Sequence, residues 1–375
     1  MKPRETKLYK EMTWDKFLEL FSEDWQNDDD PIIVYQWLLD TGTELHGFHA
    51  RIVEELLEEG SIEPAEEDHL GEEEVDSYED EAAIPEAPAS TKLDATNIYD
   101  ESSWKTKKKK DGTIRIEKYL GSESSLVIPD GVSEIGESAF EGNSFLISVV
   151  IPVGVTRIED YSFAGCSNLT SIGLPDGLKN IFCGAFYGCK NLKSVVIPNG
   201  VSLSVKVFRG CQNLTTVKLP SDLPTIPEDL FWGCKKLTSV VIPDSVDHIG
   251  EEAFKNCTSL VSVTLQQGIN SIGQHAFAGC KNLTSLMIPE GVGLIDVYAF
   301  EGCSSITSVI FPESVDQIWV GAFNNCTSLA SAVIHARARI YEGAFDGCPH
   351  LVIHAPRGSS AFDYAITNRI PFIED

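Results

Sequence analysis

The 375-residue sequence contains no run of apolar residues as long as the roughly 18 that an α-helix needs to span a bilayer. Its first residues, Met1 to Leu8, lack the apolar core of a secretory signal peptide. We therefore expect no membrane span and a cytoplasmic location. The alternative is a cell-surface or secreted protein that is exported by an unrecognised route.

Positive charge is scarce. The chain has 29 Lys and Arg against 57 Asp and Glu, a formal net charge of -28 and an isoelectric point near 4.6. Binding to phosphates needs clustered Lys and Arg, so this balance argues against nucleic acid and against an anionic membrane surface as partners.

Motifs that carry chemistry are also missing. The sequence has no Cys-x-x-Cys, no Gly-rich phosphate loop after a strand and no Gly-x-Ser-x-Gly. His335, His350 and His354 lie near the end of the chain, where they could meet and bind a metal or could simply be polar substitutions. No pair of carboxylates stands out by its spacing. We predict no catalytic residues, no metal and no cofactor, so the protein is not expected to be an enzyme.

What the sequence does contain is a repeat. One phenylalanine returns every 23 residues, and every 22 residues at two places. The ten copies are Phe140, Phe163, Phe186, Phe208, Phe231, Phe254, Phe277, Phe300, Phe323 and Phe345. A fixed period of this length indicates a solenoid or a propeller.

A cysteine stands three residues after nine of the ten phenylalanines, and the first copy has Asn143 instead. Leu or Ile follows three residues later. We expect the repeat cysteines to be packed free thiols, which suit a reducing compartment, although bridges between successive turns are an alternative. Cys183 lies outside this pattern, either as a variable turn residue or as an exposed reactive thiol.

Each copy continues with a strand pattern. Apolar residues nine and eleven positions after the phenylalanine, such as Val195 and Ile197, alternate with residues of the opposite face. A proline such as Pro198 ends the strand, and a turn such as Asn199-Gly200 follows. A second short apolar run, Val-x-x-Ile, leads back to the next phenylalanine.

One copy has too small an apolar face to fold alone, but stacked copies share a continuous interior. The sequence therefore predicts a solenoid with a parallel β-sheet and about ten turns of 22 to 23 residues. At about 4.8 Å between neighbouring strands, the stack is on the order of 50 Å long.

The unit Ile-Pro-x-Gly-Val-x-x-Ile-x-x-x-Ala-Phe-x-Gly-Cys-x-x-Leu-x-x-Val resembles the BspA-like leucine-rich repeats over roughly residues 111–375. This resemblance implies a curved solenoid that is used for binding, often on bacterial or protist surfaces, without catalytic residues. Residues 111–120 resemble the opening strand of such arrays, and residues 355–372 resemble their closing cap.

A different region precedes the repeat. Residues 1–60 predict a small all-α module of two or three helices that begin near Thr13, Asp30-Pro31 and Thr43, with Gly60 as the stop. This module is either structural or a helix pair that binds a partner or dimerises.

Residues 61–104 predict an acidic disordered linker, because no Lys or Arg occurs between Arg51 and Lys92. It is a solvated spacer, or an acidic tail that folds back on the basic run Lys105–Lys110. The predicted solenoid then covers 105–354, and its cap covers 355–375.

Two surfaces are candidate binding sites. The first is the variable position directly after the repeat phenylalanine, where Tyr187, Arg209 and Trp232 fall on three successive copies. These residue types are favoured at interface hot spots. Phe182 and Trp319 occupy another variable position, just after the Val-x-x-Ile run. Chance placement of these residues is the alternative.

The second surface is the outward face of the predicted sheet. In the first nine copies Ser or Thr occupies the position eight residues after the phenylalanine, and the tenth position is mostly apolar, interrupted by Gly173 and Lys218. The apolar members are Val150, Val196, Val241, Met287, Ile310 and Val333. They serve strand propensity, or they form a strip that contacts a partner.

These observations together predict a non-enzymatic recognition or scaffold protein that binds another protein through the solenoid. The alternative is a surface or secreted adhesin. The sequence does not indicate which protein is the partner or what the oligomeric state is.

Overall fold

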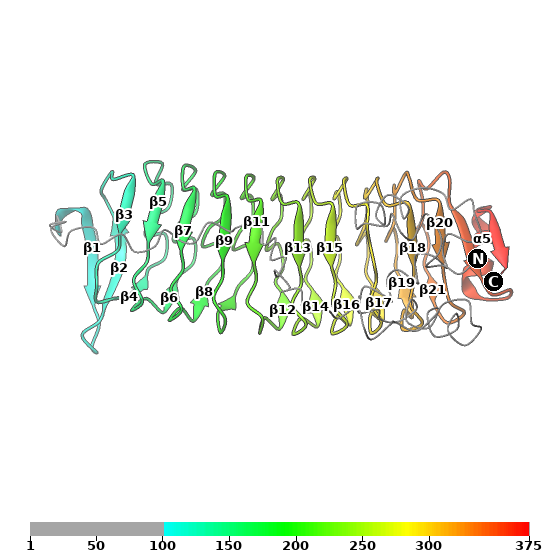
Figure 1. Ribbon diagram of the computed structural model, residues 1–375, viewed down its shortest axis with the longest axis horizontal. Helices are drawn as coiled ribbons and strands as arrows, with labels where there is room; N and C mark the ends of the chain where they lie inside the picture. The colour runs from blue at the N-terminus through cyan, green and yellow to red at the C-terminus, as the bar shows by residue number, and fades with distance from the viewer. Residues whose placement is uncertain (1–100, 375) are drawn as a thin grey trace, which may run out of the picture. The chain divides into compact units, whose positions relative to one another are not determined.

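A computed structural model describes residues 101–374. The predicted helical module at 1–60 and nearly all of the predicted linker at 61–104 lie outside these residues. The described part is a parallel β-solenoid of about eleven turns that stack side by side along one axis (Figure 1). The predicted repeat solenoid is thus confirmed, and helix is confined to a few residues near each end of the stack.

The first sheet contains the predicted strand of each copy, and equivalent repeat positions pair in parallel, as Val149 does with Ile172. Its strands are β3 (Ser125–Val127), β5 (Ser148–Val150), β7 (Ser171–Gly173), β9 (Ser194–Val196), β11 (Thr216–Lys218), β13 (Ser239–Val241), β15 (Ser262–Thr264), β18 (Ser308–Ile310), β20 (Ser331–Val333) and β22 (Val352–Ala355). The copy between β15 and β18 contributes a single bridge, Ser262 to Ser285.

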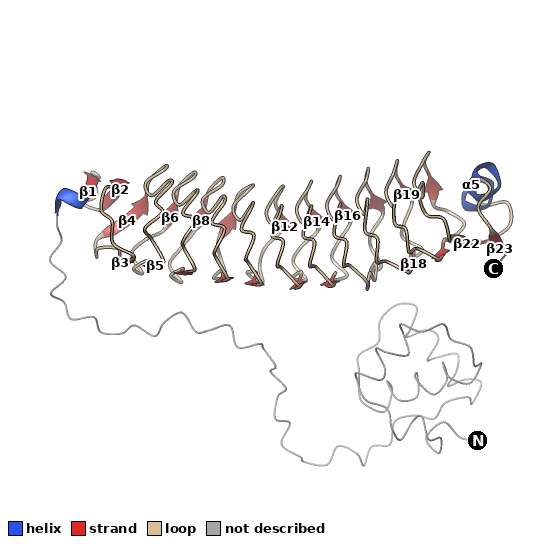
Figure 2. Ribbon diagram, turned by 90° about the horizontal axis from the view of Figure 1, so that it is seen from above, coloured by secondary structure: helices blue, strands red, loops and turns tan. Residues whose placement is uncertain are grey.

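The Val-x-x-Ile run forms a second parallel sheet, which the sequence pattern did not predict. Its strands are β2 (Ile114–Tyr119), β4 (Val132–Ile135), β6 (Arg157–Ile158), β8 (Asn180–Ile181), β10 (Ser202–Leu203), β12 (Thr225–Ile226), β14 (His248–Ile249), β16 (Ser271–Ile272), β17 (Leu294–Ile295), β19 (Gln317–Ile318) and β21 (Arg339–Ile340). Figure 2 shows the two sheets along opposite edges of the stack. The second sheet is interrupted between β10 and β12, where Pro224 and Pro227 flank β12 and cannot donate to a ladder.

A tight turn around the repeat phenylalanine forms a third hydrogen-bonded side of the solenoid. The backbone N–H of Phe254 donates to the carbonyl oxygen of Ala276 in the next turn at 2.7 Å, and that of Phe163 donates to Ala185 at 2.8 Å. Backbone groups on three sides are therefore satisfied between turns, as buried amides require.

The core is organised by the phenylalanine side chains. Their rings stack face to face through nine successive contacts, with centroid separations between 4.7 and 5.8 Å. Each of these rings is almost completely buried. Because aromatic pairs at this separation stabilise beyond their burial, the stack holds each turn to its neighbours.

The repeat cysteines are free thiols, and each one donates an S–H hydrogen bond to a phenylalanine carbonyl oxygen in the preceding turn. The Sγ–O distances lie between 3.1 and 3.3 Å in all nine cases. Burial raises the pKa of Cys211 and of Cys280 to about 12. The donor must be the protonated thiol, which explains why a small group with a proton suits this position better than alanine.

Both ends of the stack are covered. At the start, β1 (Trp104–Lys108) pairs antiparallel with β2, and the Trp104 and Tyr119 rings extend the phenylalanine stack, with Tyr119 5.2 Å from Phe140. The short 3-10 helix η3 (Glu101–Ser103) precedes β1.

At the other end, helix α5 (Ser360–Asn368) and strand β23 (Phe372–Glu374) cover the last turn, where β23 pairs with β22. The ring of Tyr364 meets Phe345 edge-on at 6.1 Å. Polar caps of this kind close the exposed ends of a solenoid core.

The raised thiol pKa values predict a loss of stability in alkali. An unfolded thiol titrates near 9.0 and the folded Cys211 and Cys280 near 12. Above pH 9 the unfolded chain therefore loses protons that the folded chain keeps, so stability falls as the pH rises. Each such thiol removes about 1.4 kcal/mol of unfolding free energy per pH unit in this range.

We expect the midpoint of guanidinium unfolding to fall between pH 8 and pH 10. The variant Cys211→Ala/Cys280→Ala should be less stable at pH 8, yet should lose about 3 kcal/mol less over the same interval, because other titrating groups are common to both proteins. An equal loss in both proteins would contradict the role given to the thiols.

Candidate interaction surfaces

The structure places Tyr187, Arg209 and Trp232 on three successive turns in one row, which we call the aromatic row. The backbone N–H of Gly188 donates to the Arg209 carbonyl oxygen at 2.8 Å, and the N–H of Gly210 donates to the Trp232 carbonyl oxygen at 2.7 Å. Tyr187 is exposed, and the other two side chains are half-buried. The repeat spacing alone brings these residues together.

Arg209 holds the aromatic row in place by two contacts. Its guanidinium carbon lies 4.3 Å from the centre of the Trp232 ring, a cation–π contact. Its Nη1 lies 2.6 Å from Oδ1 of Asp229, but off the hydrogen-bonding direction, so the contact is an ion pair rather than an aligned hydrogen bond. Lys206 approaches the other oxygen of Asp229 at 3.7 Å.

Asp229 is a neighbour of the aromatic row that the sequence pattern missed. It is almost fully buried, and this desolvation raises the pKa of its carboxyl group, while Arg209 and Lys206 oppose the rise. The residue also has a left-handed backbone, with φ of 58°. It occupies the position two before the repeat phenylalanine, where Gly184 and Gly321 stand in other turns, so the glycines mark the left-handed backbone but nothing in the sequence marks Asp229 as buried.

Phe182 and Trp319 do not share one site. The guanidinium carbon of Arg157 lies 4.6 Å from the centre of the Phe182 ring, a cation–π contact. Phe182 belongs to the same turn as Tyr187. Trp319 belongs to a turn four repeats beyond Trp232, where it stacks on Tyr341 at 4.9 Å. Its Nε1 donates to Oε1 of Gln317 at 2.8 Å. Trp319 is therefore separate from the aromatic row.

Tyrosines at the left-handed position lie over glycines of the next turn. A Cβ atom placed on Gly184 would come within 2.5 Å of the Tyr161 ring, and one on Gly321 would collide with Tyr298. Both glycines have positive φ, but non-glycine residues such as Lys206 and Glu252 adopt the same backbone conformation at this position in other turns, so the glycines are needed mainly for space.

The outward residues of the first sheet occupy equivalent positions in successive turns, and the strands are hydrogen-bonded in four separate groups: β3-β5-β7, β9-β11, β13-β15 and β18-β20-β22-β23. Val127 pairs with Val150, Val196 with Lys218, and Ile310 with Val333. The exposed fractions reach 63% for Val241 and 66% for Met287. We call this set the apolar strip. Its members are Val150, Val196, Val241, Met287, Ile310 and Val333, of which all but the half-buried Val333 are exposed.

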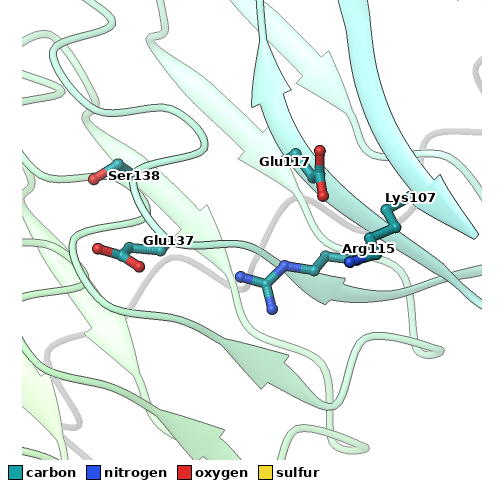
Figure 3. A pocket seen from close by; sticks show the side chains of 5 residues that line it. All are labelled: Lys107, Arg115, Glu117, Glu137 and Ser138. Carbon is teal, nitrogen blue, oxygen red and sulfur yellow. The ribbon is translucent and has the colours of Figure 1, made fainter. Parts of the chain in front are cut away.

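A hollow of about 490 Å³ lies at the first turns, between β1, β2 and the turn after β4 (Figure 3). Lys107, Arg115, Glu117, Glu137 and Ser138 line it, so every lining side chain is charged or polar. Arg115 is already paired with Glu134 at 2.5 Å. Binding pockets for organic molecules are mostly apolar, so this hollow is not a convincing candidate for one.

Within residues 101–374, no group of three or more His, Cys, Asp or Glu side chains is arranged to hold a metal ion. His335, His350 and His354 accordingly form no such group there. In the same residues, no helix combines the length and the apolar character that crossing a membrane requires.

A family model described as "BspA type Leucine rich repeat region (6 copies)" matches residues 118–238 and 224–352. The chain therefore belongs to the BspA-type leucine-rich repeat family, as its repeat motif indicated. A repeat solenoid of this family is consistent with a role in protein interaction or at a surface.

Solved structures of bacterial leucine-rich repeat proteins are similar to this chain. A leucine-rich repeat protein of T. pallidum is 31% identical over 55% of this chain and 88% of its own, with a TM-score of 0.40. A leucine-rich cell surface protein of Faecalibacterium prausnitzii A2-165 is 25% identical over 72% of this chain and 97% of its own, with a TM-score of 0.39. No curated protein matches the chain. The family assignment rests on the repeat sequence.

The buried ion pair generates the first prediction for this surface. Arg209→Ala removes the main counter-ion of Asp229 and should lower the free energy of unfolding by about 2–3 kcal/mol, because an unpaired carboxylate is left in a buried position. The double variant Arg209→Ala/Asp229→Asn should recover part of this loss. Chemical denaturation of the three proteins measures both values, and a double variant less stable than Arg209→Ala would contradict the assignment.

The contact between Tyr161 and Gly184 generates a second prediction. Gly184→Ala should lower the free energy of unfolding by about 2–3 kcal/mol, since it combines left-handed backbone strain with a collision. Gly200→Ala is the matched control, because Gly200 also has positive φ, at 78°, but nothing lies within 4 Å of an added Cβ. It should cost only the strain, about 1 kcal/mol. Equal losses would show that the tyrosine ring imposes no constraint.

Proposed function

We propose that this protein is a non-enzymatic recognition or scaffold protein that binds a protein partner through the aromatic row. The observation that carries the proposal is the placement of Tyr187, Arg209 and Trp232 side by side on three turns, with Arg209 fixed between the Trp232 ring and a buried carboxylate. Rigid aromatic and Arg side chains lose little entropy on binding and dominate interface energies.

The apolar strip is the second candidate surface. It is exposed and regular, but its β-branched members also suit a strand on grounds of propensity alone. Strand propensity does not explain the aromatic row, because the row lies in a turn. The buried Asp229 carboxylate beside it costs stability, which a purely structural role would not require. We therefore favour the aromatic row as the main contact and treat Phe182 as its nearest extension.

We also propose a cytoplasmic location, for which the eight buried free thiols are the support, since such thiols are typical of reducing compartments. The alternative of a surface or secreted protein has the support of the family's general role. Fractionation of intact cells separates the two, and protein found outside intact cells would favour the alternative.

Comparative capture tests the binding surface. The full chain and the variant Tyr187→Ala/Trp232→Ala are each used to capture proteins from native cell lysate, and the affinity of any protein held by the full chain is then measured with purified components. We expect the double substitution to weaken binding by at least about 30-fold, the effect of losing one or two hot-spot residues.

The matched control is Val196→Ser/Val241→Ser, which changes two exposed residues of the apolar strip and should leave the affinity within about threefold. Tyr187 and Trp232 are not fully buried, so both variants should fold, and circular dichroism checks this. If only the strip variant loses the partner, the interface belongs to the first sheet. If neither variant changes the affinity, both proposed surfaces are wrong.

A further inference from the structure

The first-sheet strand of each repeat lies between two bends of the chain. We call the bend at the fourth and fifth residues after the repeat phenylalanine the leading corner, because it precedes the strand, and the turn at the thirteenth and fourteenth residues the trailing corner. The strand between them carries the apolar strip, at the tenth residue after the phenylalanine. Both corners therefore border the outward face of the first sheet.

The two corners carry charges of opposite sign. In the ten copies, the leading corner and the seventh residue after the phenylalanine hold five exposed lysines and no Asp or Glu. The trailing corner holds five Asp or Glu, no lysine and a single arginine, Arg337. The lysines are Lys190, Lys193, Lys235, Lys236 and Lys281, and the acidic residues are Asp176, Asp222, Asp244, Glu290 and Glu313.

In two turns, the opposite charges do not pair within the described part of the molecule. Lys236 and Asp244 of the Phe231 turn are separated by seven residues, which span about 20 Å in a strand. Within residues 101–374, no ion pair involves Lys235, Lys236 or Asp244. The same is true there of Lys281 and Glu290, in the Phe277 turn. These charges are therefore available to an opposing surface.

The turn of Phe140 is an exception, because both of its corners are apolar. Phe145 stands in its leading corner, where the other nine copies have polar residues. Val153 stands in its trailing corner, where the next seven copies have polar residues, and Ile147 occupies the seventh position. All three side chains are exposed. The two corners of a turn are thus complementary in kind: apolar with apolar here, positive with negative in the turns of Phe231 and Phe277.

Complementary corners on one face fit a second copy of the same face. The stack runs nearly straight in both views (Figures 1 and 2). When two such faces meet with their stacks parallel, a two-fold axis along the stack sets each turn opposite the same turn of the other copy. Each leading corner then lies over a trailing corner. The antiparallel arrangement instead sets leading corners over leading corners, where lysines oppose lysines, and like charges disfavour association.

The parallel arrangement matches the residues turn by turn. Lys235 and Lys236 lie opposite Asp244, and Lys281 lies opposite Glu290. In the same way Phe145 lies opposite Val153, and the apolar strip runs close to the two-fold axis. At the turn before Phe140, Glu123 would lie opposite Asp130, so the contact is expected to end there.

The area of this face is sufficient for a stable dimer. The eight turns from Phe140 to Phe300 extend about 40 Å at the usual strand spacing, and the strand between the corners spans about 20 Å. Each copy therefore contributes about 800 Å², which equals the share of one partner in a standard protein interface.

We propose that two copies of this chain form a parallel two-fold dimer through the outward faces of their first sheets, with the lysines of each leading corner paired to the acidic residues of the opposite trailing corner. The apolar strip then contacts a second copy of the chain. The aromatic row lies at a different position in the repeat and is not part of this contact, so the proposal does not depend on it.

Sedimentation of the full chain over a concentration series measures the association. We expect a species with twice the 41.1 kDa mass of one chain, and a dissociation constant that is about micromolar or tighter, as for other interfaces of this area. A chain that stays monomeric at about 100 μM would overturn the proposal.

Charge reversal tests the pairing of the corners. The variant Lys235→Glu/Lys236→Glu sets glutamates against Asp244 and should weaken the dimer at least about tenfold, and Asp244→Lys should do the same. In an equal mixture of the two variants, both contacts of the mixed dimer again join opposite charges. Its dissociation constant should return to within about threefold of the parent value. All three changed side chains are exposed, so the variants should fold, and circular dichroism checks this.

The matched control is Lys108→Glu/Lys179→Glu, which makes the same change in net charge at exposed residues in or beside strands of the second sheet. It should leave the dissociation constant within about threefold of the parent value. An equal loss in the control and in Lys235→Glu/Lys236→Glu would contradict the proposal, because it would show an effect of net charge alone. A mixture of the two reversed variants that stays as weak as each alone would rule out the parallel arrangement.

Zero-length cross-linking with a carbodiimide gives an independent test in a mixture of isotopically light and heavy chains. We expect links from Lys235 or Lys236 to Asp244, and from Lys281 to Glu290, that join a light chain to a heavy one. A dimer without these links would place the interface elsewhere on the chain. Binding of a partner at the aromatic row changes none of these readouts, so the two proposals can fail separately.

Discussion

The stacking of one phenylalanine per turn is the interaction on which the rest of this structure depends. The ring separations of 4.7 to 5.8 Å match the spacing of the two parallel sheets, so side chains and backbone impose the same repeat distance. The thiol of the following cysteine then satisfies the phenylalanine carbonyl of the preceding turn. The phenylalanine thus sets the distance between turns, and the cysteine of the next turn adds a second hydrogen bond to a carbonyl oxygen that already accepts a backbone N–H within its own turn. The other core positions keep Leu, Ile or Val, and the surfaces are built from the outward positions, which vary from turn to turn.

The two candidate surfaces differ in the interactions that fix their side chains. The apolar strip follows directly from strand alternation, so any sequence that forms the first sheet presents some strip of this kind. The aromatic row lies in a turn, where Arg209 is fixed by a buried carboxylate on one side and an indole ring on the other. That arrangement costs desolvation and has no counterpart in the regular turns around Phe277 and Phe300. Departures from the repeat rule are expected where a sequence has been selected for something other than folding.

Much of this structure could be predicted from the sequence, because each repeat position occurs in ten copies, and the residue types found there together indicate whether the position is buried or exposed. The first sheet, its register, the buried cysteines and the outward face of Val196 and Met287 all follow from alternation. The second sheet did not follow, because two-residue strands within Val-x-x-Ile are too short to show a period of two. Asp229 was missed since one carboxylate among 57 carries no mark of burial. Its environment is made by Arg209 of the preceding turn, and such a contact appears only when the turns are stacked.

The fit of Tyr161 over Gly184, and of Tyr298 over Gly321, has a consequence for how such arrays can change in length. Repeat proteins gain and lose turns by duplication and deletion of gene segments. In this chain a turn with tyrosine at the left-handed position must be followed by a turn with glycine there, so the turns are not interchangeable. If the turn of Phe186 were removed, Lys206 would take the place of Gly184, and its side chain would collide with the Tyr161 ring. A duplication or deletion that keeps each tyrosine turn together with the glycine turn after it preserves this fit, whereas one that separates them forces the tyrosine ring to move.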